Sequence, residues 1–295
     1  MDLSIIIVSW NVRECLKDCL SRIFLSQTDF FLEVFVVDNN SADETAAMVR
    51  ADFPQVKLIA NSENRGFAKA NNQAFRESIG RYALLLNPDT LSNEKTFNNL
   101  INWLDDNQQA SISGCLLLDE DNKILKHVRK FPTLFDQLVI ILKAPHIFPA
   151  VLNNYLRKDF NYSVAQKVDS VRGGFMAIRR ETLSKIIGEE RLKKGELLDE
   201  RYFLWFEEVD LCRSAHAVGL EVWYTPDTSC VDLVGASFSQ LPRLNTQKYF
   251  RASMLKYFKK WHPAWQVFIL RLAWPMGFFL AWFLDKLGMK SKKNT

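Results

Sequence analysis

Two carboxylates follow directly on short apolar runs of this 295-residue chain. Asp38 ends one run, and Asp89 follows another within the sequence Asn87-Pro88-Asp89. A carboxylate in such a place can accept hydrogen bonds from a pyrimidine imide N–H or from ribose hydroxyls. It can also bind Mg²⁺ or Mn²⁺ on a diphosphate, because phosphates and waters complete the metal's coordination shell. The alternative for both residues is structural, a helix cap near Asp38 and a common turn at Asp89.

A second acidic group comprises Glu207, Glu208 and Asp210, which stand between aromatic residues and a helical pattern. Acidic residues are common at solvated helix N-termini, where they interact favourably with the helix dipole. These acids, however, follow an apolar and aromatic segment. A carboxylate in partly apolar, anionic surroundings has its pKa raised, which suits a general base.

The sequence Arg172-Gly173-Gly174 offers a cation and two backbone positions that a substrate could approach closely. It is equally consistent with a bulge or bend at the start of a strand. Arg65 begins a segment that opens a helix and could face a phosphate or a base, although a solvated helix start explains it as well.

Several kinds of chemistry find no support in the sequence. It contains neither a P-loop, a dinucleotide-binding glycine motif, a nucleophile elbow nor a zinc-protease motif. The five cysteines are odd in number and form no Cys-x-x-Cys, which predicts reduced thiols in a cytoplasmic protein. The body of the chain, up to residue 242, is mildly acidic, which argues against nucleic-acid binding.

The elements that must position these groups alternate between continuous apolar strands and helical patterns. This alternation predicts an α/β fold with a mostly parallel sheet flanked by helices, which binds ligands at the carboxyl ends of its strands. Residues 119–170 are less regular and predict a helix or a surface flap. The predicted strands are 3–9, 33–38, 56–60, 82–87, 110–118, 171–183 (entering a helix) and 221–226, and the predicted helices begin near Val12, Ser41, Phe67 and Ser92, with another within 198–219.

Six segments in this order resemble the family 2 inverting glycosyltransferases of the GT-A fold, especially the rhamnosyltransferase-like branch. The segments are SIIIVSWN, VVDNNSAD, NRGFAKANN, LLLNPDT, GGFMAIRRE and FLWFEEVDLCRSAHAVG, and the resemblance covers residues 3 to about 240. It implies a metal-dependent inverting transfer of rhamnose or a similar sugar from a nucleotide-diphosphate sugar to a lipid-linked glycan or polysaccharide precursor. The alternatives are a sugar-nucleotide nucleotidyltransferase and a non-catalytic membrane-associated binding protein.

The resemblance also implies roles for individual residues. Glu208 would be the catalytic base, with Glu207 and Asp210 as alternatives, and Asp89 would hold Mg²⁺ or Mn²⁺. Asp232 stands where the family usually has a histidine and is a possible second metal ligand. The nucleotide would contact Ser9, Asn11, Asp38, Asn40, Arg65 and Asn87, and the donor and acceptor would contact Arg172, Gly173, Gly174 and Trp205.

The C-terminal part of the chain has a different character. From Arg243 onward there are eleven basic residues and one acidic residue, a balance of +10. Within it, residues 267–284 form an apolar run with one charge, and four Trp lie in or near this run. We expect a glycosyltransferase domain at 1–245 and a membrane-associating segment at 246–295, peripheral or monotopic on the cytoplasmic face. That segment would be an interfacial helix or a hairpin broken at Pro275; packing on the catalytic domain or on a second subunit is the alternative.

Overall fold

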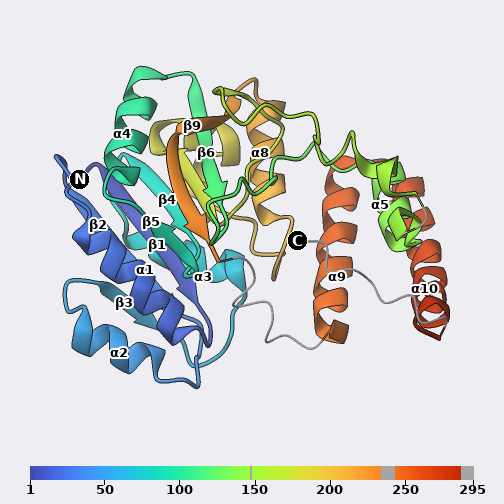
Figure 1. Ribbon diagram of the computed structural model, residues 1–295, viewed down its shortest axis with the longest axis horizontal. Coiled ribbons are helices and arrows are strands. Elements are labelled where there is room, and N and C mark those ends of the chain that lie inside the picture. The colour runs from blue at the N-terminus through green and yellow to red at the C-terminus, as the bar shows by residue number, and fades with distance from the viewer. Residues whose placement is uncertain (147, 234–242, 287–295) are drawn as a thin grey trace.

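The computed structural model describes residues 1–146, 148–233 and 243–286. Figure 1 shows a twisted central sheet with helices against it and a separate group of helices, α5, α9 and α10, to one side. The strands lie in the order β3-β2-β1-β4-β8-β6-β9-β5, with β7 paired to β9. The predicted α/β fold with a central sheet is confirmed.

The first half of the sheet is parallel, as expected from its continuous apolar strands. It comprises β1 (Leu3–Ser9), β2 (Leu32–Asp38), β3 (Lys57–Ala60) and β4 (Tyr82–Leu86). Parallel neighbours require crossover connections, and the helices α1 (Arg13–Leu25), α2 (Thr45–Asp52) and α3 (Phe67–Glu77) supply them. The carboxyl ends of β1, β2 and β4 therefore meet along one edge.

The second half is mixed. The strand β8 (Phe175–Arg179) runs antiparallel between β4 and β6 (Ala110–Leu118), while β9 (Glu221–Asp232) is parallel to β6. The short strands β5 (Thr90–Ser92) and β7 (Gln166–Lys167) pair antiparallel with β9. This arrangement brings Asp232 beside Thr90, and so places it next to Asp89.

One expected helix start was wrong. Ser92 does not cap a helix, because it ends β5, and α4 runs from Thr96 to Asp106. The hydroxyl of Thr96 instead accepts a hydrogen bond from the backbone N–H of Asn93 at 2.9 Å.

The region 119–170 contains α5 (Leu134–Ile141), η1 (Ala144–His146) and η2 (Pro149–Leu152). Thr133 and Asp136 form a reciprocal capping box at the start of α5. After β8 come the short helices η3 (Arg180–Thr182), α6 (Leu183–Ile187) and α7 (Glu189–Lys193), and then α8 (Glu207–Ala217).

The C-terminal segment forms two helices, α9 (Arg243–Trp261) and α10 (Ala264–Lys286). The hairpin expected at Pro275 was wrong, because α10 continues through this residue. The chain instead turns between the two helices, ahead of α10. In the three described ranges, no helix combines the length and the apolar character that crossing a bilayer requires.

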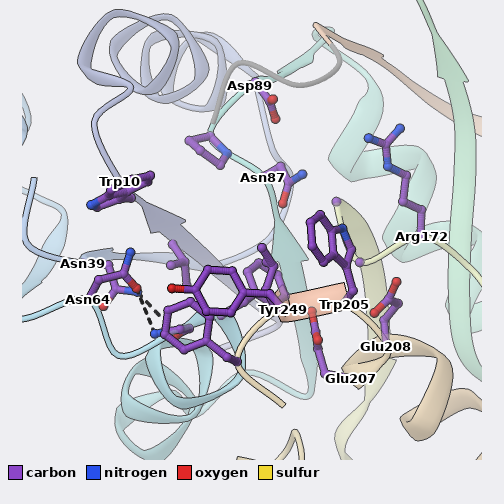
Figure 2. Close-up of a pocket in the computed structure, with 18 of the residues that line it drawn as sticks. Trp10, Asn39, Asn64, Asn87, Asp89, Arg172, Trp205, Glu207, Glu208 and Tyr249 are labelled. Atoms are coloured by element: carbon purple, nitrogen blue, oxygen red, sulfur yellow. Dashed lines mark hydrogen bonds between the residues drawn. The ribbon is translucent and has the colours of Figure 1, made fainter. Parts of the chain in front are cut away.

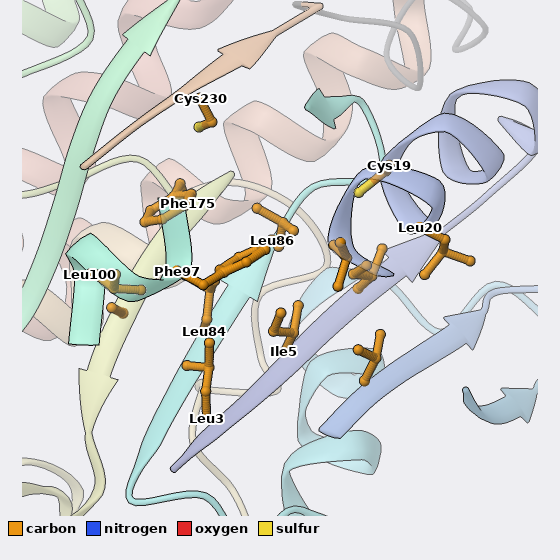
Figure 3. Packing of buried hydrophobic residues seen from close by; sticks show 14 of the residues in the cluster. Leu3, Ile5, Cys19, Leu20, Leu84, Leu86, Phe97, Leu100, Phe175 and Cys230 are labelled. Atoms are coloured by element: carbon orange, nitrogen blue, oxygen red, sulfur yellow. The ribbon is translucent and has the colours of Figure 1, made fainter. Parts of the chain in front are cut away.

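The core lies on both faces of the sheet, because alternate residues of each strand point in opposite directions. Ile5 and Leu84 belong to the cluster that α1 and α4 cover, which Figure 3 shows. Their neighbours Ile6 and Leu85 belong to the opposite cluster, with α3 and α8. A third cluster joins α5, α9 and α10 to the segment that precedes α8.

Arg179 fixes β8 in place. Its side chain is 6% exposed, and its guanidinium donates to the carbonyls of Ala110, Leu104 and Asn107 and to the Tyr82 hydroxyl. The Arg179 side chain on β8 thus joins β4, β6 and the end of α4.

Replacing Arg179 with Leu should lower the free energy of unfolding by about 3 kcal/mol, because several buried acceptors lose their donor at once. Urea denaturation of the purified protein measures this. The exposed Arg50 on α2 is the matched control: Arg50→Leu should change stability by less than about 0.5 kcal/mol. Equal effects of the two substitutions would contradict the role of Arg179.

Candidate active site

A cavity of about 500 Å³ opens at the carboxyl ends of β1 and β4. Figure 2 shows Asn87 and Asp89 on one side of it and Glu207 and Glu208 on another, with Trp205 between them and Arg172 to the side. The structure thus brings together three of the carboxylates that the sequence singled out, Asp89, Glu207 and Glu208. Also lining the cavity are Val8, Trp10, Asn39, Asn64, Gly66, Phe67, Pro88, Gly173, Gly174, Phe203, Leu204, Asn245 and Tyr249.

Asn39 organises the wall after β2. Its amide oxygen accepts from the backbone N–H of Arg65 at 3.0 Å. Its amide nitrogen donates to Asn64 at 3.0 Å, a contact that Figure 2 shows. The sequence had pointed to the neighbours Asp38 and Asn40, and neither lines the cavity. The signal for Asn39 was its place immediately after the last strand residue.

The other expected nucleotide contacts lie behind or beside this wall. The Asp38 carboxylate is buried and accepts from the backbone N–H of Ser41 at 3.2 Å. The Asn11 side chain accepts from Ala42 N–H at 2.7 Å, so it joins two loops. Ser9 is buried at the end of β1, and Arg65 is exposed. None of these four side chains lines the cavity.

The turn Asn87-Pro88-Asp89 is held by the glycines before β8. The backbone N–H of Asn87 donates to the Gly174 carbonyl at 2.9 Å. A Cβ on Gly174 would lie 2.9 Å from the side-chain nitrogen of Asn87, so a larger residue there would displace the Asn87 side chain that lines the cavity. Gly173 is different, because an added Cβ would make ordinary contact with Glu208 at 3.4 Å.

Asp89 and Asp232 come together through β5 and β9. Asp232 is the register partner of Thr90, and the backbone N–H of Leu233 donates to the Asp89 carbonyl at 3.0 Å. The Asp89 side chain is 2% exposed, and among the described residues its Oδ1 has no hydrogen-bond partner. Asp232 pairs with Arg172 at 2.9 Å.

A divalent cation fits this arrangement. No group of three or more His, Cys, Asp and Glu side chains in the described ranges could hold an ion by itself. Two neighbouring carboxylates are nevertheless sufficient for Mg²⁺ or Mn²⁺ when a diphosphate and waters provide the other oxygens. The buried, unsatisfied oxygen of Asp89 is the atom best placed to be a ligand.

A turn of unusual backbone geometry leads into α8. Trp205 and Phe206 have φ angles of 67° and 71°, a left-handed conformation that non-glycine residues rarely adopt. The turn leaves Trp205 against the cavity and starts the helix with Glu207 and Glu208, both of which line the cavity.

Burial raises the pKa of both glutamates, and the negative charge of Glu208 raises that of Glu207 further. The positive charge of Arg172 partly offsets the shift at Glu208. Glu208 is also the less buried of the two. The charge of Arg172 and the greater exposure of Glu208 both favour ionisation of Glu208 over that of Glu207, which favours Glu208 as the base.

Asp210 is engaged elsewhere. Its carboxylate accepts from Lys260 at 2.7 Å and from the Trp261 indole at 2.6 Å, both at the end of α9. It does not line the cavity. It joins α8 to α9, away from the cavity in which a base would act.

Part of the cavity has an aromatic rim that was not predicted from the sequence. Phe203 stacks on Tyr249 of α9, with ring centroids 4.5 Å apart, and Trp10 lies at the end of β1. Periodicity could not predict the pairing of Phe203 with Tyr249, because these rings meet only when α9 packs against the segment before α8. Asn245, also on α9, lines the same cavity.

Comparison with known proteins identifies the family of this chain. Residues 4–187, more than half of the chain, match the sequence profile of glycosyl transferase family 2. The chain belongs to this family. The expected family is thereby confirmed, and so is the enzyme class, a glycosyltransferase.

Two relatives are rhamnosyltransferases by name. Rhamnosyltransferase WbbL of Escherichia coli K12 is 26% identical over 230 residues, covering 75% of this chain and 80% of the relative. The N-acetylglucosaminyl-diphospho-decaprenol L-rhamnosyltransferase of Mycobacterium tuberculosis H37Rv is 21% identical over 220 residues, covering 71% and 68%.

Among solved structures, the mannosyltransferase PcManGT of Pyrobaculum calidifontis, in complex with GDP-Man and Mn²⁺, superposes with a TM-score of 0.55. It covers 96% of this chain and 75% of its own at 20% identity, which shows a shared fold. The GT-A fold of this glycosyltransferase is thus confirmed.

The raised pKa of Glu208 should set the acid limb of the pH profile. Because the base must be ionised, kcat/KM should fall tenfold per pH unit below a pKa that lies above the ordinary value of about 4.3. In Arg172→Gln, loss of the positive charge should move this limb to higher pH. Steady-state rates between about pH 4 and 9 measure the limb's position separately from the plateau.

Glu207→Gln is the matched control and should retain the acid limb, whereas Glu208→Gln should lower kcat by about 10³-fold. If Glu207→Gln abolished the limb and Glu208→Gln left it in place, the two residues would exchange roles.

Proposed function

We propose that this glycosyltransferase moves rhamnose or a similar hexose from a nucleotide-diphosphate sugar to a hydroxyl of a lipid-linked glycan precursor, with inversion at the anomeric carbon. The observation that carries the proposal is a single cavity in which Glu208 and Asp89 lie on different walls. One wall can bind the leaving diphosphate, and the other can activate the attacking hydroxyl.

The nucleoside would lie toward Trp10 and Asn39. An aromatic ring offers a face on which a base can stack, and the Asn39–Asn64 amide pair gives a rigid polar wall. The diphosphate would then point toward Asn87 and Asp89 on the neighbouring strand end.

Asp89 would hold Mg²⁺ or Mn²⁺ on this diphosphate, with Asp232 as the neighbouring carboxylate. The ion supplies positive charge that stabilises the leaving group. Arg172 contributes a second positive charge beside it, although its pairing with Asp232 means that it must share its guanidinium or reorient when the donor binds.

The reaction would be one displacement. Glu208 takes the proton of the acceptor hydroxyl while that oxygen attacks the anomeric carbon, and the bond from this carbon to the diphosphate oxygen breaks on the opposite face. The electron pair leaves with the diphosphate, where positive charge stabilises it. The configuration at the anomeric carbon is therefore inverted.

Contact with a membrane surface is the second part of the proposal. Trp265, Phe268, Leu272 and Met276 recur at three- and four-residue spacing on α10, and each is 57–62% exposed. The opposite face of the helix, including Leu270, is buried against α9 and the segment before α8. An apolar stripe on a basic segment fits the surface of an anionic bilayer.

This contact would hold the enzyme peripherally on the cytoplasmic face, where a lipid-linked acceptor is accessible. The tuberculosis relative's name specifies a diphospho-decaprenol acceptor, which supports this substrate class. The domain boundary at 245/246 and a homo-oligomeric state stay predictions.

Transfer should require a divalent cation. With the correct donor, chosen from a panel of dTDP-, UDP- and GDP-sugars, EDTA should abolish turnover, and Mg²⁺ or Mn²⁺ should restore it. Asp89→Asn should lower kcat by at least about 100-fold through loss of a metal ligand. Asp121→Asn, an exposed carboxylate 73% accessible, is the control and should be unaffected. Full activity of Asp89→Asn in EDTA would refute the metal.

Binding to vesicles should depend on the α10 stripe. The triple variant Phe268→Ser, Leu272→Ser and Met276→Ser should bind phosphatidylglycerol-containing vesicles at least about tenfold more weakly in a flotation assay, because apolar burial is lost. Wild-type binding should also weaken as salt rises.

The control removes exposed apolar groups elsewhere. Leu25, Phe31 and Ile79 are 75%, 76% and 68% exposed, and a triple serine variant at these positions should bind as the wild type does. Equal losses in the two triple variants would mean that binding is nonspecific.

A further inference from the structure

A second cavity lies beside the active site and takes no part in the chemistry described so far. Its volume is about 270 Å³, and it is bounded by α5, α9 and α10. Its walls are largely apolar, with Ile140 and Ile141 from α5, Phe250 from α9, and Trp274 and Gly277 from α10.

The two cavities are neighbours. Trp205 lines both of them. In addition, α9 presents Asn245 and Tyr249 to the active site and Thr246 and Phe250 to the second cavity. A ligand extending past Trp205 would therefore have one end beside Glu208 and the other among apolar side chains.

The second cavity is built into the packing of the helices. A Cβ on Gly277 would lie 2.4 Å from the Ile141 carbonyl oxygen, so α10 and α5 meet backbone to backbone at this point. Phe250 and Trp274 line the cavity beside this contact.

The surroundings match one kind of ligand. On α10, Met276 is 59% exposed next to Gly277, and on α5, Phe135 is 60% exposed, so apolar groups continue from the cavity to the surface. Lys143 lies at the cavity, and among the residues that the structure describes it forms no ion pair. Its positive charge can pair with a phosphate.

We infer that this cavity binds the isoprenoid chain of the acceptor, with Lys143 against the acceptor's phosphate and the sugar hydroxyl reaching Glu208 past Trp205. The inference rests on the proposed function and adds a binding site to it. The chain would enter from the bilayer past the exposed Met276 and Phe135, beside the contact of α5 with α10, so the enzyme need not extract the whole lipid.

Photo-cross-linking tests the inference directly. A farnesyl diphosphate that carries a diazirine on its chain is irradiated with the full-length protein, and the labelled peptides are mapped by mass spectrometry. We expect labels on α5, α9 and α10. A phosphatidic acid with the same diazirine should label the exposed stripe of α10, but it should label the cavity residues Ile141, Thr246 and Phe250 at least tenfold less. Equal labelling of these cavity residues by the two lipids, or labelling elsewhere only, would overturn the inference.

Substitutions within one helix sharpen the test. Thr246→Trp fills the cavity and should reduce labelling at least fivefold, whereas Ala252→Trp, at an exposed position of α9, should not. Because Thr246→Trp could disturb folding, Lys143→Gln provides a second variant without added bulk. Lys143→Gln should be labelled less than the wild type, because the diphosphate of the probe loses its cationic partner, and Lys143→Arg should restore the labelling. Unchanged labelling of both Thr246→Trp and Lys143→Gln would overturn the inference.

Cross-linking needs no turnover, so its outcome is separate from that of the proposed function. Glu208→Gln should label as the wild type does. If sugar transfer to a lipid acceptor succeeds and the cavity is not labelled, the cavity assignment fails alone. If the cavity is labelled and no sugar is transferred, the proposed function fails alone.

Discussion

The site depends on holding several carboxylates together in a cavity with little positive charge. Asp89, Glu207 and Glu208 line it, Asp232 lies directly beside it, and among the described residues of its lining Arg172 is the one cation. Like charges in a poorly solvated space repel, so such a set is costly unless protons or cations neutralise it. The raised pKa values of the two glutamates favour their neutral forms, which lowers the repulsion. The charge of Asp232 is balanced by its ion pair with Arg172. Asp89 has a buried oxygen with no hydrogen-bond partner among the described residues, and we propose that a bound cation balances its charge.

Much of the fold followed from the sequence because its first half obeys simple rules. Continuous apolar strands separated by helices specify parallel pairing, and strand ends specify where ligands bind. Asn87, Asp89, Arg172 and Glu208 were therefore expected together and lie around one cavity. The second half is less regular because β8 enters the sheet antiparallel after a long excursion, and pairing over such distances leaves no periodic signal.

The parts that the sequence could not predict depend on backbone direction or on distant packing. Which of three consecutive polar residues faces the cavity depends on the turn after β2, and the answer is Asn39. Tyr249 reaches the site only because α9 packs on the segment before α8. Pro275 is tolerated within α10, although a proline inside an apolar run had made a broken hairpin one of the two expected forms. The same packing means that α9 serves the active site at its start and fastens to α8 through Asp210 at its end.

The turn at Trp205 and Phe206 has a consequence for how this enzyme can change. Each left-handed non-glycine residue costs roughly 1–2 kcal/mol, and the chain has two in succession. Glycine at position 205 would relieve part of that strain, but it would remove the Trp205 side chain, which lines both cavities. Selection for heat resistance alone would therefore favour replacements at this turn that impair catalysis. Substitutions that raise the thermal stability of this protein should therefore be sought at other positions, with Trp205 and Phe206 unchanged.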